Sequence, residues 1–86
     1  MEELRTYYRE YKEAQERADR ADEAWERDPE NEAKEKEFDE AYNAEFKAYE
    51  RLADKAYIFC KGKIDSKTMR MMITTRQKEF EAIIGA

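Results

Sequence analysis

The sequence predicts an all-α protein. A long antiparallel helical hairpin, about residues 2–27 and 29–61, carries a shorter third helix, about 65–84, packed on its open end. Apolar residues recur every three or four positions, and only two glycines and one proline interrupt the helix formers. Aromatic residues make up 13% of the chain, which argues against the disorder that 45% charged residues and a mean hydropathy of -1.21 would indicate. We expect a single coiled-coil-like, three-helix domain over residues 1–86.

The first element is a long amphipathic helix over residues 2–27. Its apolar positions are separated by steps of three or four, so they form one stripe along the helix. The large side chains lie in the first half of the stripe, and alanine dominates the second half. The stripe consists of Leu4, Tyr8, Tyr11, Ala14, Ala18, Ala21 and Trp25.

The segment "DPEN", residues 28–31, predicts that one helix stops and another starts. Asp28 suits the N-cap of the new helix and Pro29 its first position. Proline also disfavours helical geometry in the residue before it. The alternative is one kinked helix that continues through Pro29.

The second element is a helix over residues 29–61. Its stripe alternates steps of four and three, the heptad spacing of coiled coils. Gly62 follows as a C-terminal glycine cap, with Lys61 in the last turn. Glu45 interrupts the stripe, so it either extends to solvent or makes a polar contact with Tyr11 or Gln15. The stripe consists of Phe38, Tyr42, Glu45, Tyr49, Leu52, Ala56 and Phe59.

The third element begins at "KIDSKTM". Asp65 suits the N-cap, and Ser66 suits it equally well. With Asp65 as the cap, Ile64 and Met69 occupy the positions of a hydrophobic staple. The helix should end near Gly85. Its apolar face consists of Met69, Met72, Ile73, Phe80, Ile83 and Ile84.

Helix length then predicts the shape. At about 1.5 Å per residue the three helices span roughly 39, 48 and 28 Å, so the third covers only the open end of the hairpin. The segment 10–45, here called the arm, should therefore protrude with two layers only, its tip near Trp25. The arm has 15 acidic and 6 basic residues, whereas residues 61–86 have 3 acidic and 6 basic ones.

The composition also excludes several kinds of site. Without histidine the chain cannot form Ser-His or Cys-His nucleophile pairs, and it lacks glycine-rich phosphate loops. We expect no enzyme activity, no cofactor and no metal. Cys60 cannot form an internal disulfide; it is either a small buried side chain or a thiol activated by Lys61 and Lys63. Neither a leader segment nor a membrane span is evident, so we expect a cytoplasmic, intracellular protein without membrane contact.

These features favour a non-catalytic module that binds a protein partner with a basic surface. Such a protein could inhibit a nucleic-acid-handling partner stoichiometrically as a nucleic-acid mimic. In size, charge and shape it is similar to phage inhibitors of host defence, including anti-CRISPR proteins, although no motif connects it to one family. Phage origin is part of this hypothesis. The predicted contact residues are Asp19, Asp22, Glu23, Trp25, Glu26, Glu30, Glu35 and Glu37.

Two interpretations of aromatic residues and two of function stay open. Tyr7 and Tyr57 lie off the apolar stripes and could form a second interface, while Trp25 could instead close the end of the hairpin. The alternative function is a structural scaffold or adaptor that forms homo-oligomers through its helical faces. A third is DNA binding by the basic C-terminal helix, which the overall net charge of -5 opposes.

Overall fold

The computed structural model describes residues 2–85, and these residues form four α-helices. They are α1 (Glu2–Arg27), α2 (Glu32–Phe59), α3 (Ser66–Thr75) and α4 (Gln77–Ile84). The all-helical class is therefore confirmed, and the two long helices pack extensively against each other. The molecule measures 46 × 21 × 18 Å. At about 1.5 Å per residue α2 alone accounts for roughly 42 Å of that length.

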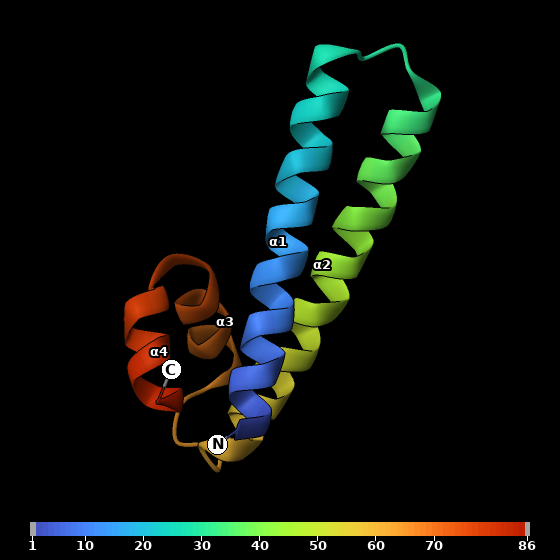
Figure 1. Cartoon of the computed structure of the whole chain (residues 1–86). Coiled ribbons are helices and arrows are strands. Elements are labelled where there is room, and N and C mark those ends of the chain that lie inside the picture. The colour runs from blue at the N-terminus through green and yellow to red at the C-terminus, as the bar shows by residue number, and fades with distance from the viewer. Residues whose placement is uncertain (1, 86) are drawn as a thin grey trace.

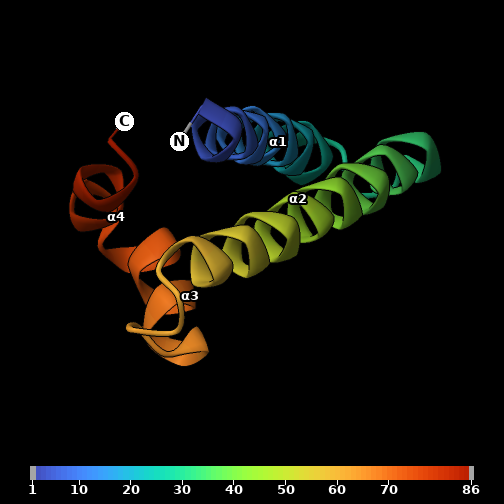
Figure 2. The same cartoon turned by 90° about the horizontal axis from the view of Figure 1, so that it is seen from below.

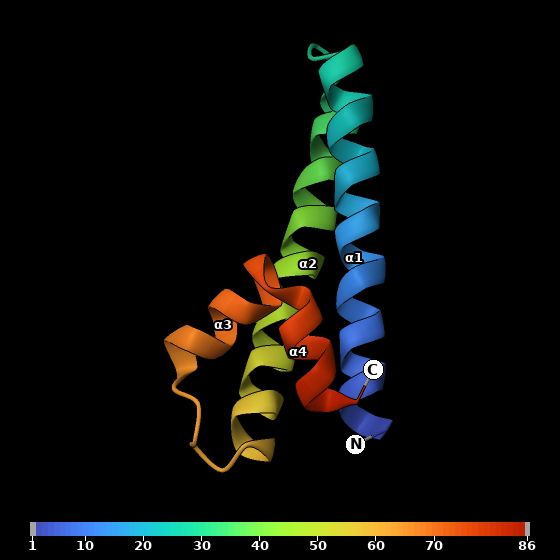
Figure 3. The ribbon, with the colours of Figure 1, turned by 90° about the vertical axis from the view of Figure 1, so that its left-hand side faces the viewer.

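The helices α3 and α4 lie beside only one end of the pair formed by α1 and α2. Figure 1 shows α1 and α2 joined by a short turn at one end, with α3 and α4 beside the end that holds the N-terminus. The view from below shows α3 and α4 to one side of the pair (Figure 2). Turned about the vertical axis, the molecule shows the half of α1 and α2 near the turn projecting past both short helices (Figure 3).

The buried side chains form two separate clusters. The base cluster combines large residues from all four helices: Leu4, Tyr8, Tyr11, Leu52, Ala53, Ala56, Met69, Met72, Ile73, Phe80 and Ile84. The arm cluster is much smaller and consists of Ala18, Ala21 and Ala41, with Phe38 packed against them. Because buried alanine removes little apolar area from water, most of the hydrophobic stabilisation comes from the base.

The buried line on α2 differs from the predicted stripe. Ala41, Leu52 and Ala56 are fully buried, but Tyr42 and Phe59, which were expected in the stripe, are 55% and 40% exposed. The contact with α1 runs through Ala41, the residue before Tyr42. One residue along an α-helix turns the side chain by about 100°, so Tyr42 points away from the seam.

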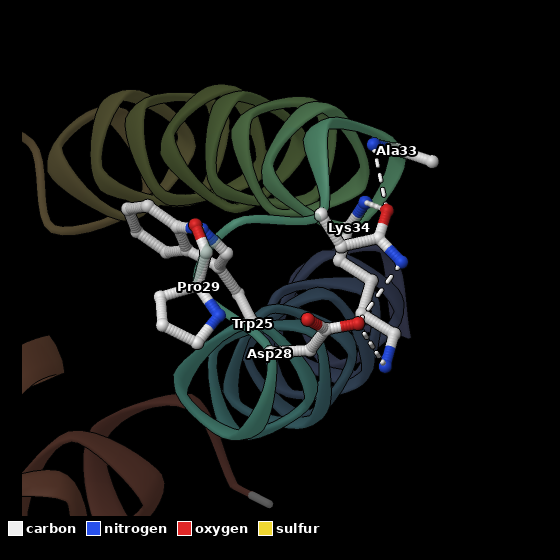
Figure 4. Close-up of polar contacts among 6 residues, drawn as sticks. Trp25, Asp28, Pro29, Ala33 and Lys34 are labelled. Carbon is white, nitrogen blue, oxygen red and sulfur yellow. Dashed lines mark hydrogen bonds and ion pairs between the residues drawn. The ribbon is translucent and has the colours of Figure 1, made fainter.

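The start of α2 corrects the prediction from "DPEN". The N-cap is Asn31, whose Oδ1 accepts hydrogen bonds from the backbone N–H groups of Ala33 and Lys34, at 3.0 and 3.3 Å. Figure 4 shows these contacts together with the ion pair between Lys34 and Asp28. Asp28 is therefore not the cap, and Pro29 belongs to the turn rather than to a helix starting at 29 or a kinked continuous helix. The Asn31 N–H instead donates to the Asp28 carbonyl at 3.1 Å, which closes the turn.

The predicted third helix, 65–84, is interrupted. Arg76 has φ -130° and ψ 56°, which ends α3 and starts α4. Just before the break, the hydroxyls of Thr74 and Thr75 donate to the Met71 carbonyl, at 3.2 and 2.7 Å. Such back-bonding competes with the helical ladder and favours a bend.

The break lets α4 pack against α1. The rings of Tyr8 and Phe80 lie 5.5 Å apart, and the Tyr8 hydroxyl donates to a Glu81 carboxylate oxygen at 2.7 Å. Burial, followed by this hydrogen bond, raises the pKa of Tyr8 well above its ordinary value. Lys12 Nζ donates to Gln77 Oε1 at 2.8 Å. These contacts connect the two ends of the chain.

Two local motifs frame the connection between α2 and α3. Asp65, one of the two predicted candidates, caps α3 by accepting a hydrogen bond from Thr68 N–H at 2.6 Å, and this bond lowers the pKa of Asp65. At the end of α2, Gly62 N–H donates to the Tyr57 carbonyl and Lys61 N–H to the Ile58 carbonyl. That pattern is a Schellman motif. Its first left-handed residue is Lys61, with φ 55°, and Gly62 follows with φ 76°.

Replacing Asn31 with alanine should destabilise the protein by about 1 kcal/mol, because two backbone donors lose their cap. Thermal unfolding followed by circular dichroism measures this as a fall of roughly 4–8 °C. Asn43→Ala, at an exposed position inside α2, is the matched control. It should not lower the unfolding temperature, because alanine is the better helix former. Equal losses in both variants would contradict the assignment of Asn31 as the cap.

Replacing Lys61 with glycine should stabilise the protein by about 1 kcal/mol, because a side chain at φ 55° is strained. The variant Lys61→Ala removes the same charge but keeps the Cβ atom, so it should give no gain. Gly62→Ala should be destabilising at φ 76°. Urea unfolding midpoints distinguish the three variants, and a gain in the alanine variant equal to that in Lys61→Gly would refute the backbone explanation.

Candidate binding surfaces

The candidate acids lie on α1, on the turn and on α2, and all are exposed except Asp22, which is half-buried. In residues 2–85 the ion pairs within 4 Å join Lys34 to Asp28, Arg51 to Glu10, Arg70 to Asp54 and Arg76 to Glu79. None of these pairs uses a candidate acid. The group comprises Asp19, Asp22, Glu23, Glu26, Glu30, Glu35 and Glu37.

Trp25 closes the end of the arm. Its ring stacks on Phe38 with centroids 5.5 Å apart and planes 24° apart, and its Nε1–H donates to the Pro29 carbonyl at 3.3 Å. Figure 4 shows the indole beside the turn. This matches the structural alternative for Trp25, whose side chain is half-buried.

The two tyrosines proposed for a second interface differ in exposure. Tyr7 is half-buried, packs against the base cluster and donates its hydroxyl to Glu3 Oε1 at 3.3 Å. Tyr57 is 42% exposed. Its neighbour Ile58 is 67% exposed and, with Phe59, borders a depression that also contains Leu4, Glu3 and Lys55. The accessible apolar surface at this depression is therefore formed mainly by Ile58 and Phe59.

A groove on α2 was not predicted from the sequence. It has a volume of about 150 Å³ and is lined by Tyr11, Tyr42, Glu45, Phe46, Tyr49 and Thr74. We call it the aromatic groove. Tyr42 and Phe46 are 55% and 49% exposed. The rings of Tyr11 and Phe46 lie 6.0 and 6.5 Å from that of Tyr49.

Glu45 is the charged group of the aromatic groove. It is half-buried, and its pKa is raised, first by burial and then by the negative charge of Asp19. Tyr11 has a raised pKa as well, because of burial and then the charge of Glu45. The carboxylate therefore lies in a site where its negative charge is poorly compensated.

Arg70 already makes a cation–π contact with Tyr49, one of the residues that line the aromatic groove. Its guanidinium carbon lies 5.6 Å from the centroid of the Tyr49 ring, within the range of a cation–π contact. The same guanidinium lies 3.9 Å from Asp54. A nearby carboxylate and an aromatic face thus hold one arginine of the chain itself.

Two further features are absent from residues 2–85. No group of three cysteine, aspartate or glutamate side chains in this range is arranged to hold a metal ion. No helix in the described part combines the length and apolar character needed to cross a membrane.

The chain matches no protein-family model, and no curated protein or solved structure is significantly similar to it. What its surfaces bind is therefore inferred from their exposure, shape and charge.

Replacing Glu45 with glutamine should stabilise the fold at about pH 7. Because folding raises the pKa of Glu45 from 4.5, the folded state binds the proton more tightly than the unfolded state. The free-energy cost of burying the charged Glu45 carboxylate is fully present at pH values above the raised pKa. It disappears as the pH falls below the pKa of the unfolded state. The gain in urea midpoint should therefore shrink at about pH 3.5.

Glu50→Gln, at an exposed position on the same helix, serves as the control for this comparison. It should change the midpoint little at either pH. A gain in Glu45→Gln that is the same at both pH values would contradict the assigned cost of the buried charge.

Proposed function

We propose that this protein is a non-catalytic binding module whose acidic arm engages a basic surface on a partner protein. The supporting observation is that the candidate acids are exposed or half-buried and form no ion pair within residues 2–85. They belong to α1, the turn and α2, and the half of α1 and α2 near the turn projects past α3 and α4 (Figure 3). A partner can therefore approach these carboxylates without displacing cations of the chain.

Electrostatics would make this binding fast and sensitive to salt. Carboxylates of one sign on a projecting surface speed the encounter with a basic partner and disfavour acidic ones. Exposed charges are screened over about 8 Å at physiological ionic strength, so added salt should weaken the complex. The basic residues of the segment 61–86 all lie outside the arm.

The finer form of the proposal is a stoichiometric inhibitor of a nucleic-acid-handling partner. Carboxylates on two neighbouring helices can stand in for rows of phosphates, and the partner would then release its DNA or RNA. Phage inhibitors of host defence, which the chain resembles in size, charge and shape, are one class of protein that this form would include. Displacement of nucleic acid by the purified protein, at a one-to-one ratio, tests this form directly.

Reversing the charge of Glu23 and Glu26 together, to lysine, should abolish capture of the partner while helicity is retained. Both side chains are exposed on α1 and lie outside the two buried clusters. The measurement is an affinity pull-down from the source organism, quantified by mass spectrometry at low and high salt. The control, Glu2→Lys with Glu50→Lys, makes the same change in net charge outside the arm. Equal capture by both variants would remove the arm from the mechanism.

A second candidate function is a homo-oligomeric scaffold, favoured by the exposed apolar residues at the base. Ile58 and Phe59, 67% and 40% exposed, would be covered if two copies met there. Sedimentation at low and high salt separates the two functions. An oligomer that persists at high salt and is dissociated by Ile58→Asp supports the scaffold, and a monomer at both salt concentrations contradicts it.

DNA binding by the C-terminal segment stays a prediction. Met69, Met72 and Ile73 are buried in the base cluster, so that face of α3 is unavailable to a nucleic-acid groove.

A further inference from the structure

We propose that the aromatic groove is a binding site for a single arginine side chain of a basic protein partner. Four aromatic residues, Tyr11, Tyr42, Phe46 and Tyr49, line it together with Glu45. This site is distinct from the exposed acids near the arm tip, although it would serve the same class of partner.

The size of the groove limits the occupant. Its volume of about 150 Å³ is below the roughly 300–1,000 Å³ of sites for drug-sized ligands and cofactors. A guanidinium with its last methylene groups is of the right scale. Thr74, at the end of α3, borders the groove and adds a hydroxyl to its rim.

The charge of the groove decides against an apolar or anionic occupant. Glu45 is already half-buried, and Asp19 adds negative charge. An apolar side chain seated over Glu45 would remove its remaining water without providing a partner, and leaving a buried charge unpaired is costly. A cation instead supplies the missing counter-charge.

The aromatic rings favour arginine over lysine. A guanidinium is planar, stacks on aromatic faces and donates a fork of hydrogen bonds to a carboxylate, whereas an ammonium is a compact, strongly hydrated charge. The chain itself provides the precedent, because Arg70 lies over the Tyr49 ring at 5.6 Å and beside Asp54 at 3.9 Å. The groove offers the same combination of ring and carboxylate to an arginine from outside.

The test is a titration with the peptide acetyl-Gly-Arg-Gly-amide, followed through the aromatic proton resonances of Tyr42 and Phe46 by NMR. The matched peptide carries citrulline, which has the shape of arginine without its charge. We expect saturable shifts with the arginine peptide, weaker ones with a lysine peptide and none with citrulline. Equal shifts with citrulline or with lysine would overturn the proposal.

Variants locate the binding. Glu45→Gln and Phe46→Ala should each lower the affinity for the arginine peptide by about fivefold or more. The matched controls Glu50→Gln and Phe59→Ala, at exposed positions elsewhere on α2, should leave it unchanged. Loss of affinity in the control variants as well would overturn the proposal. Resonance shifts that depend on protein concentration alone would also overturn it, because the groove would then hold a second copy of the protein.

The same titration separates this site from the arm. The variant Glu23→Lys with Glu26→Lys should bind the arginine peptide as the parent protein does. If the peptide fails to bind the parent protein while the pull-down still depends on Glu23 and Glu26, the groove proposal fails and the arm proposal stands. If the peptide binds the parent protein but replacing Glu23 and Glu26 does not change capture in the pull-down, the groove proposal stands and the arm proposal fails.

Discussion

The size of the side chains between α1 and α2 determines most of this structure. At the base, tyrosine, leucine, methionine and isoleucine form a cluster thick enough to hold two further helices. Along the arm the seam consists of Ala18, Ala21 and Ala41, so the helices contact each other but bury little apolar surface. No third layer covers the part of the arm near the turn, and its outer faces remain in water. The stability of the arm therefore depends on the base and on the turn that joins the two helices.

The exposed acids and the aromatic groove both follow from this difference in thickness between the base and the arm. The exposed acids lie where α1 and α2 have no covering helix, so the basic residues of α3 and α4 do not neutralise them (Figure 3). The aromatic groove lies at the boundary between the covered and uncovered parts, because Thr74, close to the end of α3, forms one of its walls. At this boundary Tyr42 and Phe46 stay 55% and 49% exposed.

Much of this could be predicted from the sequence, because helical periodicity and cap residues act locally. The bounds of the first helix and the division into a large-residue base and an alanine arm were right, and Asp65 was one of the two candidate caps. The start of α2 was wrong because Asp28 and Asn31 are both good cap residues, and three-dimensional packing of the turn decides between them. The break at Arg76 was missed because Ile73 and Phe80 are two turns apart and keep the helical spacing. The aromatic groove depends on where α3 ends, which no local pattern in α2 reveals.

The position of the tryptophan has a practical consequence. The chain contains one tryptophan, and it is stacked on Phe38 at the end farthest from the base cluster. Its fluorescence therefore reports on the closure of that end alone, whereas the ellipticity of the whole chain reports on every helix. Local opening of thinly packed regions precedes global unfolding in many proteins. In this molecule the two processes carry separate optical signals without any introduced label.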